Sequence, residues 1–220
     1  MRRSFLFALM LFLLTLCLGL LTDGNAAEPY VIHVDVPSKC LTLFQGDALV
    51  KQYAIATGAW DTPTPVGVYT IVSRFSGEMC GFGTCFLGLN VPFGQYGIHG
   101  TNKPESIGSN ASHGCIRMKV SDAEELYALV PNGTRVVIED SPYGELGYTL
   151  RPLKNGDRSS AVAALQRKLR ALGYYHGWPD GIYGQATSDA VLCARKDLQL
   201  SSVDSVDWAF YQAIGLTPFE

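Results

Sequence analysis

The sequence predicts a mostly-β domain followed by a small domain of three helices. Between residues 29 and 140, short β-rich runs alternate with turn residues. Between residues 156 and 217, apolar residues recur at helical spacing instead. The stretch 141–155 carries Pro, Gly and Asn without periodicity, so we interpret it as a linker. With 220 residues, the chain is long enough for each domain to bury a core.

The N-terminus is typical of a signal peptide. Arg2 and Arg3 form a positive start, residues 5–21 are almost entirely apolar, and small residues lie at 24–26. We therefore expect residues 1–26 to be removed on export, with an uncleaved membrane anchor as the alternative. The protein is expected in the cell wall, the periplasm or the medium, and only this N-terminal segment is expected to meet the membrane.

The net charge limits the possible partners, and the number of cysteines limits how the thiols can pair. The formal net charge is −3, which argues against nucleic acid as the partner. Of the six cysteines, Cys17 lies in the apolar N-terminal run. The remaining five cannot all pair within one chain, so at least one stays free or bonds another molecule. Cys80 and Cys85 could close a local loop, and unpaired buried thiols there are the alternative. The pairing of Cys40 and Cys193 stays open.

Turn residues mark the boundaries of the strands expected in the first domain. Gly46-Asp47 between two β-rich runs predicts a hairpin, and the prolines and Gly67 precede a further strand. Pro131-Asn132-Gly133 predicts a turn. The glycine-dense stretch 77–108 suits loops around a site. The expected strands fall within residues 30–36, 40–44, 48–57, 67–73, 96–99 and 134–139.

One short helix is expected in this domain, over residues 121–130. Ser121 and Glu124 fit a capping box, because a serine with a glutamate three residues later can satisfy two backbone amides at a helix start. Leu126 and Leu129 lie on one face of such a helix.

The second domain shows three helical segments. Val162, Leu165 and Leu169 have the spacing of one helix face within residues 159–173, and Gly173 is a stop signal. A second helix is expected after Thr187 as its cap. A third is expected within residues 206–215.

Cys115, in the stretch SHGCIRM, is the candidate nucleophile. A thiol needs a base to take its proton, and a nearby imidazole does this in cysteine acyl-transfer enzymes. His113 lies two residues away, where contact is cramped. His99, at the end of an expected strand, can be brought back beside Cys115 by the intervening chain, so we favour His99 as the base.

The residues around this pair have candidate roles of their own. The carbonyl of Gly100 could orient the imidazole. The amides of His113, Gly114 and Cys115 could form an oxyanion hole, and a glycine next to the nucleophile allows close approach of substrate. Ser112 and Arg117 are candidates for substrate binding, and Arg117 could also lower the pKa of the thiol.

Other interpretations of these residues remain. A lone cysteine in a glycine-rich loop is often structural. His99, His113 and Cys115 could hold zinc with an open position, although no fourth ligand and no zinc spacing is evident. His33 and His176 are expected to be structural. No metal and no organic cofactor is expected.

The residues around His99 and Cys115 resemble a known signature. IHGTN followed by SHGCIRM is similar to the signature of the bacterial L,D-transpeptidase (YkuD-like) catalytic domain, and TPTPVGVYTI and LGLNVP resemble stretches that precede it. The resemblance covers about residues 30–139. It implies a β-sandwich with a short helix and a catalytic cysteine.

The resemblance also implies roles and a reaction. Cys115 would be the nucleophile, His99 the base oriented by Gly100, and His113 and Gly114 parts of the oxyanion hole. The reaction would join peptidoglycan stem peptides by 3→3 cross-links through a thioester. The alternatives are an L,D-carboxypeptidase on the same site and a non-catalytic wall-binding protein.

The second domain resembles a small peptidoglycan-binding domain. The matching stretches are VAALQRKLRALGYY, DGIYGQATSDAV and VDWAFYQAIG. The sequence departs at Ala194-Arg195, where a Phe-Gln pair is common. The resemblance implies peptidoglycan stems and glycan as partners, and a stabilising appendage that binds nothing is the alternative.

Overall fold

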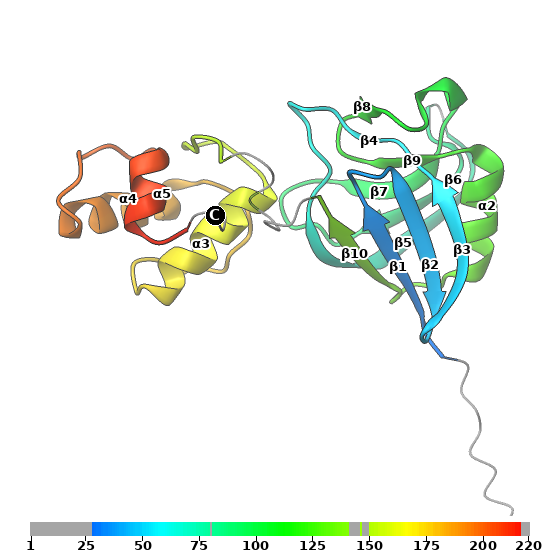
Figure 1. Cartoon of the computed structure of the whole chain (residues 1–220), viewed down its shortest axis with the longest axis horizontal. Helices are drawn as coiled ribbons and strands as arrows, with labels where there is room; N and C mark the ends of the chain where they lie inside the picture. Colours follow the sequence, from blue (N-terminus) through cyan, green and yellow to red (C-terminus); the bar gives the residue numbers. More distant parts are fainter. Residues whose placement is uncertain (1–27, 80, 141–145, 147–149, 217–220) are drawn as a thin grey trace, which may run out of the picture.

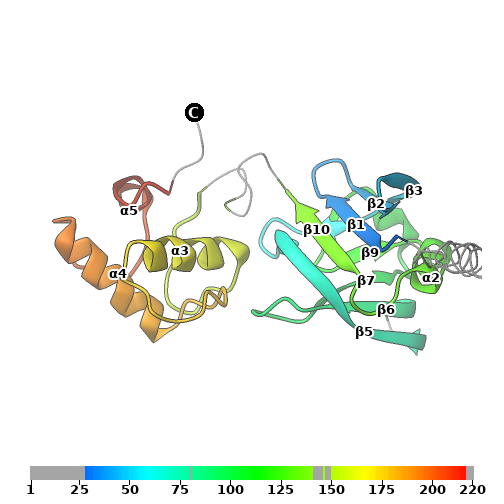
Figure 2. The same cartoon turned by 90° about the horizontal axis from the view of Figure 1, so that it is seen from below.

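The computed structural model describes residues 28–79, 81–140, 146 and 150–216. Within these residues the two predicted domains lie side by side along the long axis of the molecule (Figures 1 and 2). The predicted signal peptide, residues 1–26, lies outside them. No helix in the described part of the chain has the length and apolar character needed to cross a membrane.

The first domain is built on one eight-stranded sheet and a two-stranded one. The large sheet has the order β3-β2-β1-β10-β5-β6-β7-β9, and β4 pairs with β8 in the small sheet. The strands of the large sheet are β1 (Tyr30–Asp35), β2 (Cys40–Gln45), β3 (Ala48–Ala54), β5 (Gly67–Met79), β6 (Gly83–Leu89), β7 (Tyr96–Gly100), β9 (Ile116–Met118) and β10 (Arg135–Glu139). Those of the small sheet are β4 (Thr57–Gly58) and β8 (Asn110–Ser112).

Strand β5 joins the two halves of the large sheet. Its first residues pair with β10, and from Ile71 onward it pairs with β6. The sheet thereby encloses one core, which combines Ile32 and Leu43 from one half with Leu87 and Ile116 from the other. The predicted mostly-β, sandwich-like domain is confirmed.

The alternation of side chains explains this burial. Along β1, Ile32 and Val34 are fully buried while His33 between them is half-buried, as a period of two requires. The predicted hairpin is confirmed, because Gln45 pairs with Ala48 around Gly46-Asp47. Gly46 has a φ of 57°, a backbone conformation that glycine adopts at little cost.

Helix α2 (Val120–Leu129) packs on the sheet beside β6 and β7. It buries Leu126, as predicted, but the predicted capping box is wrong. The cap is Lys119, which makes no side-chain cap bond, and Ser121 lies inside the helix. The Glu124 carboxylate accepts a hydrogen bond from Thr84 on β6 instead, so a tertiary contact replaces the local one.

The second domain contains the three predicted helices, α3 (Ser160–Ala171), α4 (Gln185–Asp197) and α5 (Trp208–Ala213), around a core of its own. Ser159 caps α3 by accepting from the amide of Val162 at 3.2 Å. The predicted cap Thr187 is wrong, since α4 starts two residues earlier after Gly184. Thr187 is buried, and its hydroxyl accepts from Gln166 at 3.1 Å.

The predicted linker ends earlier than residue 155. Residues 141–145 and 147–149 lie outside the described part, but Leu153 belongs to the second core and pairs with Val206. The second domain therefore begins before the predicted residue 156.

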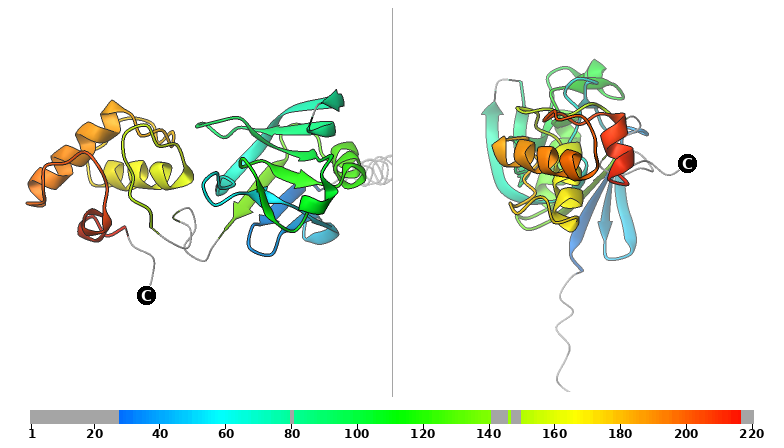
Figure 3. Two further views of the ribbon diagram at one scale, coloured as in Figure 1. Left: turned by 90° about the horizontal axis from the view of Figure 1, so that it is seen from above. Right: turned by 90° about the vertical axis from the view of Figure 1, so that its left-hand side faces the viewer.

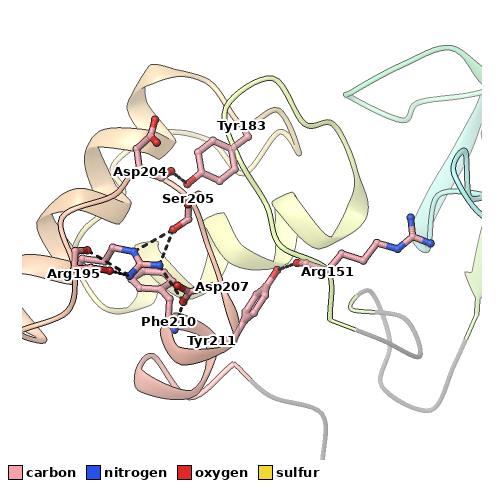
Figure 4. A network of polar contacts seen from close by, with 9 residues as sticks. Arg151, Tyr183, Arg195, Asp204, Ser205, Asp207, Phe210 and Tyr211 are labelled. Carbon is pink, nitrogen blue, oxygen red and sulfur yellow. Dashed lines mark hydrogen bonds and ion pairs between the residues drawn. The ribbon is translucent and has the colours of Figure 1, made fainter.

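Arg195, where the sequence departs from the usual pattern, is only 1% exposed. Its guanidinium donates to the carbonyl of Ser205 at 2.8 Å and lies 3.0 Å from a carboxylate oxygen of Asp207 (Figure 4). It also lies over the ring of Phe210, 5.0 Å from its centroid. The buried cation is thus paired and hydrogen-bonded, which is the condition for placing a charge in a core.

Candidate active site

The loop that joins β8 to β9 carries Cys115, and Ser112 holds its shape. The Ser112 hydroxyl donates to the carbonyl of Cys115 at 2.5 Å and accepts from the amide of Gly114 at 3.0 Å. Gly114 has a φ of 108°, and a Cβ there would lie 2.5 Å from the Tyr96 ring. Only glycine fits this turn, so this loop conformation requires the glycine of the sequence SHGC.

Strand register brings His99 toward Cys115. Parallel pairing of β7 with β9 places His99 opposite Arg117. Cys115 lies in the loop just before β9, and its thiol is within hydrogen-bonding reach of the backbone of Gly97, two residues before His99 on β7. The imidazole is 2% exposed, and its Nδ1 lies 2.5 Å from the carbonyl oxygen of Gly100. The structure therefore holds the His99 imidazole against Gly100 and seats the Cys115 thiol against the same strand, β7.

Two phenylalanines enclose the imidazole. The centroid of the Phe82 ring lies 4.7 Å from that of His99, edge to face, and the Phe86 ring stacks on it at 5.9 Å. Sequence reasoning missed both residues. Phe86 lies opposite His99 because β6 pairs antiparallel with β7, whereas the glycine-dense stretch 77–108 is expected from the sequence to form loops. Phe82 comes from the glycine-rich stretch before β6, where no local pattern points to a site.

Burial sets the charge state of the pair. It lowers the pKa of His99, and Arg117 lowers it further, against the Gly100 and Phe82 carbonyls. Burial raises the pKa of the Cys115 thiol, against the Gly97 amide and Arg117. At neutral pH the resting pair is therefore an uncharged thiol beside an uncharged imidazole. Arg117 has the predicted effect on the thiol, but burial outweighs it.

The other predicted residues lie around this pair. Arg117 is half-buried, and its Nη1 donates to the carbonyl of Ala111 at 3.1 Å. Its Nε is buried and has no hydrogen-bond partner within the described residues. His113 is exposed and lines a cleft beside the loop. The predicted oxyanion-hole amide of Gly114 is engaged by Ser112 in this structure.

The remaining histidines, His33 and His176, lie outside this site, and the described residues offer no zinc site. His33 lies 2.9 Å from Glu139 at the sheet surface, and His176 is exposed in the second domain. The described residues contain no grouping of three His, Cys, Asp or Glu side chains that could hold a metal ion. Cys40, Cys85, Cys115 and Cys193 are free thiols. The alternative of an unpaired buried thiol therefore holds at Cys85, and Cys80 lies outside the described residues.

Comparison with known proteins decides the family. The model of the "L,D-transpeptidase catalytic domain" family, YkuD, matches residues 29–138, which is half of the chain. The chain belongs to the YkuD family of L,D-transpeptidase catalytic domains. The "Putative peptidoglycan binding domain" family matches residues 158–204, within the second domain.

Several YkuD relatives resemble the first domain. "Putative L,D-transpeptidase YkuD" of Bacillus licheniformis is 48% identical over 110 residues, which are 50% of this chain and 66% of the relative. "Putative L,D-transpeptidase YqjB" of Bacillus subtilis is 31% identical over 128 residues, covering 51% of this chain and 72% of the relative. The match to the first of these spans just under two-thirds of its length.

Among solved structures, L,D-transpeptidase 3 from Mycobacterium tuberculosis is similar with a TM-score of 0.46 and 20% identity, covering 51% of this chain and 61% of that one. The catalytic domain of an Enterococcus faecium L,D-transpeptidase gives a TM-score of 0.44 and 24% identity, covering 52% of this chain and 99% of that one.

Proposed function

We propose that the protein is a cysteine-dependent L,D-transpeptidase that forms 3→3 cross-links between peptidoglycan stem peptides. The observation that carries the proposal is that β7 holds the His99 imidazole, whose Nδ1 lies against the Gly100 carbonyl, and meets the Cys115 thiol at Gly97. Family membership supports the same reaction class.

The first half-reaction is acylation of Cys115. Its sulfur attacks the carbonyl of the third stem residue, whose α-carbon has the L configuration, while Nε2 of His99 takes the thiol proton. A C–S bond forms and the C–N bond to the terminal D-alanine breaks. His99 returns the proton to the departing amine, so the products are a thioester and free D-alanine.

The second half-reaction transfers the acyl group. A side-chain amine of another stem attacks the thioester carbonyl and loses a proton to His99. The C–S bond breaks, an amide forms, and the proton returns to the Cys115 sulfur. No metal or organic cofactor takes part in this sequence.

The surroundings of the pair suit this chemistry. A neutral imidazole is the form that accepts a proton, and its lowered pKa preserves that form below neutral pH. Arg117 offers positive charge beside the reacting sulfur, where the tetrahedral intermediate and substrate carboxylates carry negative charge. Ser112 is assigned to loop geometry, because its hydroxyl is used within the loop.

The partners and location follow from the family and the second domain. Peptidoglycan is the substrate of the catalytic domain, and the second domain belongs to a type associated with peptidoglycan binding. Both assign the protein to the cell wall outside the cytoplasm. Export through residues 1–26 is part of this proposal.

The test is intact-mass analysis of the protein incubated with a disaccharide-tetrapeptide. We expect an adduct on wild-type protein that corresponds to loss of D-alanine, no adduct on Cys115→Ala, and cross-linked dimer among the products. Tripeptide without dimer would reassign the protein as an L,D-carboxypeptidase. An adduct of equal yield on Cys115→Ala would remove the cysteine from the mechanism.

A further inference from the structure

A cleft of about 650 Å³ lies between the two domains and reaches the catalytic loop. The catalytic domain contributes Trp60, Tyr96 and His113 to its lining, and the helical domain contributes Arg151 and Arg158. His113 stands two residues before Cys115, so the cleft reaches the loop that carries Cys115. Its volume falls in the range typical of ligand sites, about 300–1,000 Å³.

Specific contacts seat the helical domain against the catalytic domain. The amide of Val66 donates to the hydroxyl of Ser160 at 2.9 Å, and Ser160 is buried at the start of α3. Gly181 approaches Phe93 so closely that an added Cβ would lie 2.4 Å from the ring. Figure 3 shows the helical domain from the far end of the molecule, in front of the sheet. The cleft walls are therefore held in place by contacts on both sides.

Arg151 ties one wall to the loop that follows β4. Its guanidinium lies 4.3 Å from the centroid of the Trp60 ring and donates to the Trp60 carbonyl at 2.6 Å. In Figure 4 this side chain points away from the helical domain toward the catalytic domain. Thr62 of the same loop donates to the carbonyl of Ser112 at 3.1 Å, so the loop links the helical domain to the catalytic loop.

Arg158 reaches the catalytic loop through Tyr96. Burial raises the pKa of Tyr96, the nearby Cys115 adds to this, and Arg158 opposes it. The Tyr96 ring packs against Gly114. Arg158 is exposed in the cleft, which leaves its guanidinium open to a ligand.

The charges of the lining select a class of ligand. The lining carries three cations and three anions, namely Lys39, Arg151, Arg158, Asp61, Asp140 and Asp157. A stem peptide carries carboxylates and, on its third residue, the amine that the proposed transfer requires, so it matches both signs. We propose that this interdomain cleft binds the stem peptide of peptidoglycan, and that Arg158 of the helical domain contacts a stem carboxylate. The inference rests on the proposed function and adds a substrate-binding role for the second domain.

The test measures the dependence of acylation on substrate concentration in the full chain, with a soluble disaccharide-tetrapeptide. Arg158→Gln removes the charge and is expected to raise KM about tenfold while kcat changes less than twofold, because the lost contact is a charge-assisted hydrogen bond. Arg158→Glu is expected to raise KM further. Lys154→Gln removes a charge from the same segment outside the cleft and should leave KM unchanged.

A second substrate identifies the group that Arg158 recognises. With the stem carboxylates converted to amides, KM should rise more for wild-type protein than for Arg158→Gln. Unchanged KM in both Arg158 variants, or a loss confined to kcat, overturns the inference. Failure of wild-type protein to form any adduct would instead count against the proposed function, and the rate of Cys115 alkylation by iodoacetamide verifies that each variant keeps an intact site.

Discussion

Nδ1 of His99 lies 2.5 Å from the carbonyl oxygen of Gly100, the next residue along β7. A carbonyl oxygen only accepts hydrogen bonds, so Nδ1 carries the proton of the neutral ring and Nε2 carries the lone pair. One backbone group thus fixes the tautomer that a general base needs. In the proposed mechanism it takes the place of the carboxylate that orients histidine in many triads.

Replacing His99 should therefore cost far more than replacing His113. For His99→Ala we expect the acylation rate to fall about 10²–10⁴-fold, the usual contribution of a general base. His113→Ala should change the rate constant at saturating substrate less than tenfold, because this side chain is exposed at the cleft. Stopped-flow mass analysis of adduct formation compares them. A larger loss in His113→Ala would exchange the two roles.

The pH dependence of acylation and of alkylation should show that His99 and Cys115 are both uncharged at neutral pH. Because burial lowers the pKa of His99 from the usual 6.5, acylation should persist below pH 6.5 and fail only as pH drops through the lowered value. Because burial raises the pKa of Cys115 from 9.0, alkylation by iodoacetamide should increase with pH and reach its midpoint above pH 9.0.

The variant Arg117→Gln tests this explanation of the two pH profiles. Its charge lowers the pKa of both groups, so in Arg117→Gln both pKa values should rise. The acid limb of the acylation profile and the alkylation midpoint should then move to higher pH together. A thiol that alkylates with a midpoint below pH 7 in wild-type protein would mean an ion pair at rest and contradict the assignment.

Ser112→Ala tests the loop. It removes both hydrogen bonds that close the turn and leaves the buried amide of Gly114 without its acceptor. We expect the acylation rate to fall about 10–100-fold, since small displacements of a nucleophile are costly. Ser109→Ala removes a similar hydroxyl contact to a backbone carbonyl at an exposed position and should have little effect. Equal rates in the two variants would show that the hydroxyl of Ser112 does not matter.

The sequence predicted those features that depend only on residues close together in the chain. Gly114 has a positive φ and no room for a side chain, and His99 lies at the end of β7 next to Gly100, so their local context was readable from the sequence. The hairpin at Gly46-Asp47 is local for the same reason.

What the sequence could not predict depends on contacts between distant segments. Ser121 and Glu124 fit a capping box, but Thr84 binds Glu124 and the helix starts at Val120. Phe82 reaches His99 only because β6 pairs with β7. The burial of Ser160 depends on the catalytic domain, which no pattern within the helical segment reveals.

Arg195 should be essential to the stability of the helical domain. Arg195→Leu keeps much of the buried volume but leaves the Ser205 carbonyl without its donor, so we expect a loss of about 2 kcal/mol in the free energy of unfolding. Arg170→Leu, at an exposed position on α3, is the matched control and should lose less than about 0.5 kcal/mol. Denaturant unfolding of the full chain measures both. A neutral Arg195→Leu would mean that apolar packing replaces the buried network fully.

The stabilities of Gly181→Ala and Gly156→Ala together distinguish the cost of backbone strain from the cost of disturbing the contact between the domains. Both have positive φ, 74° and 95°, so alanine should cost each about 1 kcal/mol of stability. Only at Gly181 would the added Cβ strike other atoms, 2.4 Å from Phe93 and 2.9 Å from the Ser159 carbonyl, whereas at Gly156 it meets nothing within 4 Å. Gly181→Ala should therefore lose more stability than Gly156→Ala.

The same pair should differ in substrate binding. Gly181→Ala moves the wall that carries Arg158 away from Phe93 and should raise KM for the soluble muropeptide, while Gly156→Ala should leave KM unchanged. Phe93→Leu gives the added methyl room, so its own cost in stability should be smaller in the Gly181→Ala background than in wild-type protein. Thermal unfolding and acylation kinetics on the four full-length variants provide the values. If Gly181→Ala and Gly156→Ala lost the same stability and kept the same KM, the approach of Gly181 to Phe93 would have no part in holding the cleft.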